Sequence, residues 1–182
     1  MTDTQDGSAQ GAGAGAGAGE PRWLDDEQMR SWLRLQAVVT LLPGLLDQQL
    51  RRDADLTHFE YLVLAMLSEA PDRELRMSAL ARLTSSTLPR LSHVAKRLEA
   101  RGLVARCAAP DDGRATVARL TDDGWDKLVD SAPGHARTVL EHVYDDLDAD
   151  DVRALSDVLA KILVHVDPGD SFRREHERPG AD

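Results

Sequence analysis

The segment from Thr87 to Gly102 carries two stripes of side chains at helical spacing, one apolar and one polar. The polar stripe consists of Pro89, Ser92, His93 and Lys96. Hydroxyl, imidazole and ammonium groups can bond to base edges in the major groove of DNA, and a proline ring can pack on a thymine methyl group. We therefore expect this helix to enter a major groove, although an ordinary solvated helix face would carry the same residue types.

Residues flanking this stripe are candidates for contacts to phosphate. Ser86 and Thr87 lie at the helix start, where hydroxyl groups and free backbone N–H groups can bind phosphate. Helix capping alone also explains why these two residue types occur there. Arg90 lies near the same end, and Arg97 is either a phosphate contact or a surface charge. Residues 73–119 hold ten Arg or Lys and four Asp or Glu, so this segment has a net charge of +6, whereas the whole chain has a net charge of −10. This segregation indicates one basic surface on an acidic body.

A basic hairpin tip follows the helix. Residues 103–108 and 115–120 read as two strands joined by turn-forming residues from Pro110 to Arg114. An arginine at such a tip suits a narrow minor groove. The alternative is that Arg114 and Asp112 are solvent-exposed charges that make the hairpin tip soluble and have no role in DNA binding.

The remaining pattern is almost entirely helical and supplies the elements that must hold these residues. We expect a first helix from the cap Asp25 to about Arg52, a second after the capping-box pair Thr57 and Glu60, and a brief third that Ser78 caps, ending near Leu83. Two more should run from Thr121 to about Leu147, with an interruption at Pro133 and Gly134, and from Asp150 onward. The fold class is mainly α with a small β-wing, in the form of a winged helix-turn-helix.

Composition indicates the limits of the domain and the cellular compartment of the protein. We divide the chain into a disordered Gly/Ala-rich tail (1–21), one domain (22–167) and a flexible tail (168–182). The longest apolar stretch, residues 37–46, is far shorter than the roughly 20 residues that span a bilayer, so we expect no membrane association. The single cysteine, Cys107, fits a reducing compartment, and we expect a cytoplasmic protein.

The chain resembles the MarR family of bacterial regulators over about residues 24–166. The resemblance rests on LSHVAKRLEARGLV from Leu91 to Val104, PDDGRAT from Pro110 to Thr116, and LTDDGW from Leu120 to Trp125, in that order and spacing. It implies a homodimer with intertwined first and last helices that binds a pseudo-palindromic operator in double-stranded DNA. It also implies a repressor that is released from DNA by a small-molecule effector or by oxidation. By the same resemblance, Arg114 is the wing arginine that inserts into the minor groove, and Asp112 is the acid that steadies it.

The resemblance places the effector pocket between the DNA-binding lobe and the dimer helices. Its candidates here are Trp32, Arg34, His58, Tyr61 and His135, each of which also fits ordinary packing. The candidates for dimerisation form one apolar face of the last helix: Val152, Leu155, Leu159, Ile162 and Val166.

The sequence lacks the residue patterns that enzymes, cofactor-binding proteins and metal-binding proteins require. We find no nucleophile with a base and no cofactor loop, since no strand precedes the Gly-rich run at 11–19, and we expect neither catalysis nor a cofactor. His135, His142 and His165 lack the i, i+4 spacing of helical zinc sites, so we expect no metal. The rival that stays open is a winged helix whose basic face binds an acidic protein instead of DNA.

Overall fold

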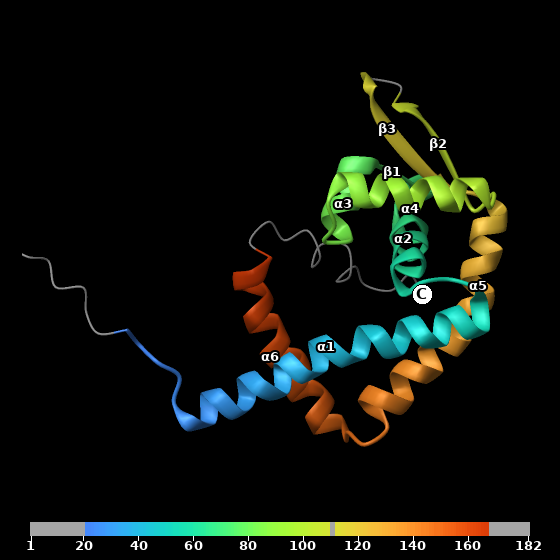
Figure 1. The fold of residues 1–182 in the computed structure, drawn as a ribbon. Coiled ribbons are helices and arrows are strands. Elements are labelled where there is room, and N and C mark those ends of the chain that lie inside the picture. Colours follow the sequence, from blue (N-terminus) through green and yellow to red (C-terminus); the bar gives the residue numbers. More distant parts are fainter. Residues whose placement is uncertain (1–20, 110–111, 168–182) are drawn as a thin grey trace, which may run out of the picture. The chain divides into compact units, whose positions relative to one another are not determined.

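The structure is a computed structural model that describes residues 21–109 and 112–167 (Figure 1). Its chain divides into two compact units, with the boundary between residues 37 and 38. The predicted N-terminal tail lies outside the described residues up to Glu20, and the predicted C-terminal tail lies outside them altogether. In the first unit the chain is irregular to Asp25 and then enters α1 (Asp26–Ala54). The Asp25 carboxylate accepts a hydrogen bond from the N–H of Gln28 (2.8 Å), which confirms the predicted cap.

The second unit begins within α1 and contains every other element. The second helix, α2 (His58–Glu69), starts with the predicted capping box: Thr57 Oγ1 accepts from the N–H of Glu60 (3.0 Å), and Glu60 Oε2 accepts from the N–H of Thr57 (2.8 Å). A 3₁₀ turn, η1 (Pro71–Arg73), follows α2, since a proline cannot continue the helix.

The short helix α3 (Met77–Leu83) corrects the predicted role of Ser78. Its N-cap is Arg76, which makes no side-chain capping hydrogen bond, and Ser78 already lies in the first turn. The reason is that β1 (Glu74–Arg76) pairs with a distant strand and delivers the chain directly into the helix. That pairing lies between residues far apart in sequence, so local capping rules do not predict it.

A small antiparallel sheet completes the lobe. Its order is β1-β3-β2, with β2 (Val104–Ala109) and β3 (Asp112–Leu120) forming the predicted hairpin. The hairpin extends past α4 (Leu88–Ala100) (Figure 1). One buried cluster joins α2, α3, α4 and the sheet, and its fully buried large side chains include Leu64, Leu80, Leu91 and Leu98. The predicted fold class is confirmed in its mainly helical architecture with a β-wing.

Two helices follow the sheet. The first, α5 (Asp122–Val139), is capped by Thr121 as predicted. The predicted interruption at Pro133 and Gly134 is wrong, because the ring of Pro133 is exposed and the helix continues past it into a π-helical turn, η2 (Leu140–Tyr144). The last, α6 (Ala149–Val166), begins at a capping box formed by Asp148 and Asp151. None of the described helices is long and apolar enough to cross a membrane.

Candidate nucleic-acid interface

The candidate interface is built on α4, and local chemistry explains where this helix starts. Thr87 Oγ1 accepts the N–H of Arg90 (3.4 Å), and Pro89 occupies the first turn, where its missing N–H costs nothing. The predicted apolar stripe is buried against the core: Leu91, Val94, Ala95 and Leu98. These contacts hold α4 as one side of the lobe.

The side of α4 opposite the core carries the candidates for base contacts. A helix turns by about 100° per residue, which places Pro89, His93 and Lys96 roughly opposite the buried stripe. All three side chains are exposed. The structure therefore leaves them accessible, as a role in the major groove requires.

One flank of α4 is tied to α2 and to the loop before it, and Arg90 and Arg97 make contacts there. Arg97 Nη2 donates to Glu60 Oε1 (3.0 Å), and the Arg90 guanidinium lies 4.5 Å from the centre of the Phe59 ring. One turn further along, Arg101 pairs with Asp55 (3.3 Å). This flank anchors α4 to the loop before α2 and to α2 itself.

Glu60 is the buried partner of that anchor. Its side chain is only 6% exposed. Burial raises the pKa of Glu60, but hydrogen bonds from Thr57 and Arg97 outweigh it and leave the pKa below its usual range. Glu60 thus stays ionised while it both caps α2 and holds α4.

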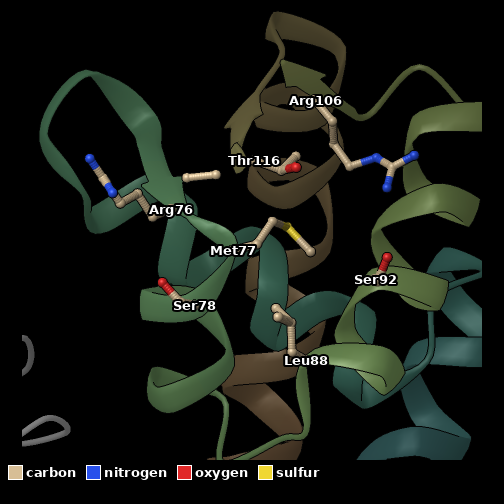
Figure 2. A pocket seen from close by; sticks show the side chains of 8 residues that line it. Arg76, Met77, Ser78, Leu88, Ser92, Arg106 and Thr116 are labelled. Atoms are coloured by element: carbon tan, nitrogen blue, oxygen red, sulfur yellow. The ribbon is translucent and has the colours of Figure 1, made fainter. Parts of the chain in front are cut away.

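The other flank of α4 faces the wing. Arg106 on β2 donates to Glu99 on α4 through Nε (2.9 Å) and Nη2 (2.6 Å), and this contact lowers the pKa of Glu99. Beside this pair, a groove of about 320 Å³ separates α4 from the sheet (Figure 2). Its lining comes from β1, α3, α4 and the hairpin: Arg76, Met77, Ser78, Leu88, Ser92, Arg106, Ala115 and Thr116.

Two candidates at the wing tip have only their backbone described. Asp112 and Arg114 belong to β3, and Asp112 pairs with Ala109, but their side chains lie outside the described part of the chain. Near the start of α4, Ser86 is half-buried and its hydroxyl donates to the carbonyl of Thr87 (3.1 Å). The roles of these three residues stay predictions.

The effector candidates divide between the two units. Trp32 and Arg34 lie in the exposed first part of α1. His58, Tyr61 and His135 come together between α2 and α5: the His58 and His135 rings stack at 6.0 Å, and the Tyr61 and His135 centroids are 4.4 Å apart. Burial lowers the pKa of both histidines, with Asp47 opposing the effect at His58 and His58 adding to it at His135.

Sequence reasoning missed a buried amide at this junction. Gln49 of α1 is 4% exposed, and its Nε2 donates to Asp53 (3.0 Å). A Cβ on Gly134 would lie 3.2 Å from that Nε2, so the glycine makes room for the amide. Gln49 Oε1 and His135 Nδ1 are both buried without a hydrogen-bond partner among the described residues. Because Gln49 is one polar residue in a long amphipathic helix, no local pattern distinguishes it.

The last helix has no buried residue of its own. Of the dimerisation candidates, Leu155 is half-buried and the others are exposed, as are Val158 and Val164. An apolar face of this length on a single chain marks an interface. Among the described residues, no three His, Cys, Asp or Glu side chains gather as metal ligands.

Comparison with known proteins agrees with the geometry. A family model described as MarR family matches residues 54–115. Two solved structures from Streptomyces coelicolor are similar over most of both chains. Sco3205, a MarR family transcriptional regulator solved in complex with DNA, is 39% identical with a TM-score of 0.77, covering 82% of this chain and 94% of its own. AbsC, another MarR family transcriptional regulator, is 34% identical with a TM-score of 0.74, covering 80% and 98%.

A curated relative matches more narrowly. The uncharacterized HTH-type transcriptional regulator YdgJ of Bacillus subtilis is 32% identical over 71 residues, which is 39% of this chain and 43% of that protein. The match to YdgJ therefore spans less than half of its length. The similarity to Sco3205 and AbsC extends along nearly their whole chains. The chain belongs to the MarR family of transcriptional regulators.

Proposed function

We propose that this regulator is a cytoplasmic repressor that binds a pseudo-palindromic operator as a homodimer and leaves it when a small molecule binds. The observation that carries the DNA-binding part is the outward face of α4. Pro89, His93 and Lys96 are exposed there while both flanks of the helix are tied to the lobe. A helix held in this way presents a rigid set of side chains to a major groove.

The dimer follows from uncovered apolar surface. Val152, Leu159, Ile162 and Val166 on α6 are exposed in the single chain. Burying such a face against a second copy stabilises the pair by the hydrophobic effect. A two-fold dimer carries two copies of α4, which favours a symmetric operator. We take residues 22–167 as the domain that forms this dimer.

The effector site that we propose lies where His58, Tyr61 and His135 meet. Two observations support it: the aromatic cluster, and the unpartnered buried atoms Gln49 Oε1 and His135 Nδ1. A neutral imidazole and an amide can both donate and accept hydrogen bonds, so this junction suits a planar ligand with polar edges. Because α5 leads from the wing strand β3 toward α6, a ligand here would act on both regions.

Selection of bound fragments from host DNA, followed by footprinting, tests this function. We expect a pseudo-palindrome with half-site centres about 10 bp apart, bound by two chains, with an affinity that falls steeply with salt. A reporter under that sequence should lose expression when the regulator is present. Failure to enrich any sequence, together with capture of an acidic protein through the basic face, would favour the protein-binding winged helix instead.

A further inference from the structure

The groove between α4 and the wing lies where a DNA strand has to pass. If α4 occupies a major groove and the β2–β3 tip the adjacent minor groove, the sugar–phosphate strand between these grooves runs between α4 and the hairpin. The groove there holds about 320 Å³, roughly ten times the ~30 Å³ share of one water molecule. It is therefore a hydrated hollow with room for a phosphate group. This step rests on the proposed DNA-binding function.

Three hydroxyl side chains from separate elements surround this groove: Ser78 of α3, Ser92 of α4 and Thr116 of β3 (Figure 2). None of these hydroxyls has a hydrogen-bond partner in the part of the chain that the structure describes. Other hydroxyls of the lobe are engaged with the backbone: Thr84 donates to the carbonyl of Leu80 (2.8 Å), and Thr121 donates to that of Gly102 (2.7 Å). The hydroxyls around the groove thus remain available to an outside acceptor.

The charge of the lining also suits an anion. It contains the two cations Arg76 and Arg106 and no carboxylate. Glu99 holds the Arg106 guanidinium on the α4 side of the groove, near Ser92 (Figure 2). Phosphate oxygens accept hydrogen bonds from both hydroxyl and guanidinium groups, and such contacts position a protein on DNA without reading its sequence.

We propose that Ser92 and Thr116 together bind one phosphate of the strand that separates the two grooves, with Arg106 supplying positive charge nearby. Ser92 lies on the flank of α4 that faces the wing, about 100° around the helix from His93. This assigns Ser92 to the backbone contacts, away from the base-reading face where the sequence pattern alone would put it. Thr116 becomes a DNA contact that the sequence pattern does not suggest.

The test combines two variants that each lack one hydroxyl group with chemically modified DNA. Thr116→Val and Ser92→Ala should each weaken operator binding by about 10- to 100-fold, as expected for the loss of one hydrogen bond to a charged group. The factor should be the same on operators with single base-pair changes, because a phosphate contact is blind to sequence. The salt slope should not change, since neutral hydroxyls release no counterions.

Methylphosphonate substitution locates the partner. Replacing phosphates one at a time should identify one position per half-site where the parent loses affinity and where Thr116→Val causes no further loss. Thr40→Val, the same change on the exposed surface of α1, is the control and should bind like the parent at every position. Thermal unfolding and sizing of each variant establish that the fold is intact.

Two results would overturn the proposal while leaving DNA binding in place. One is parental affinity in both Thr116→Val and Ser92→Ala. The other is a loss in Ser92→Ala that disappears on changing one base pair, which would return Ser92 to base reading. If the parent binds no DNA sequence at all, the proposed function itself fails, and that outcome is distinct from both.

Discussion

The tie between Arg97 and Glu60 should contribute measurably to stability, in contrast to a matched ion pair one turn away. Glu60 Oε2 accepts from the N–H and the hydroxyl of Thr57 (2.8 and 2.9 Å), whereas Oε1 accepts from Arg97 (3.0 Å). Arg97→Met keeps the apolar stem of the side chain but removes this donor. It therefore leaves one oxygen of a buried carboxylate without its charged partner.

The expected cost follows from the burial of the two groups. Losing a hydrogen bond to a buried charged group costs about 1–3 kcal/mol. The Arg97 side chain is 48% exposed, so water replaces part of the lost contact, and we expect about 1–2 kcal/mol. The control is Arg101→Met, because the Asp55 partner of Arg101 is 95% exposed. That change should cost less than about 0.5 kcal/mol.

Urea unfolding at fixed protein concentration, pH 7, measures both variants, and a double-mutant cycle with Glu60→Gln isolates the pair. We expect a coupling of about 1 kcal/mol between Arg97→Met and Glu60→Gln. The pKa of Glu60 is lowered from its usual 4.5, so its contribution is present above pH 4.5 and is lost as the pH falls through the folded-state value. Equal losses in the Arg97 and Arg101 variants, or a coupling of zero, would refute the view that burial of Glu60 makes this contact strong.

Three further results should follow from the structure. Leu159→Asp places a charge on the apolar face of α6, so sizing chromatography should show monomers or insoluble chains. The control Lys161→Asp on the same helix should leave the dimer intact. A normal dimer from Leu159→Asp would contradict the interface. Burial keeps the pKa of His135 below its usual 6.5, so below that pH the unfolded chain binds more protons than the folded chain. The free energy of unfolding should therefore fall from pH 7.5 to 5.5, and it should fall less in His135→Gln. The same pH dependence in both proteins would be evidence against a buried, neutral His135. Arg114→Ala should weaken binding to every DNA sequence and lower the salt slope by about one, and an unchanged slope would show that this side chain meets no phosphate.

Much of the fold was predictable from local sequence, because the signals involved act over a few residues. Caps at Asp25, Thr57, Thr87 and Thr121 satisfy N–H groups within one helical turn, so each marks its helix start without knowledge of the rest of the chain. The buried stripe of α4 and the hairpin were likewise readable from side-chain periodicity. Ser78 was misjudged as a cap because β1 pairs with β3 across some forty residues of sequence.

The candidate site shows the same division between local and distant contacts. Periodicity alone distinguishes an apolar from a polar side of α4, and it correctly left Pro89, His93 and Lys96 exposed. Only the tertiary structure divides the polar side further, since Arg97 turns to Glu60 of α2 while Ser92 turns to the groove beside β3.

The physical reason is that a side chain's partner depends on which element packs beside it, and that packing is set by the whole core. The grouping of His58, Tyr61 and His135 and the burial of Gln49 are set by such contacts between elements that are distant in sequence. The sequence by itself determined most of the helices and the hairpin, the caps of α1, α2, α4 and α5, and the family resemblance. The packing of α2, α5 and the sheet around α4 decided which polar residues meet each other and which remain open to a partner.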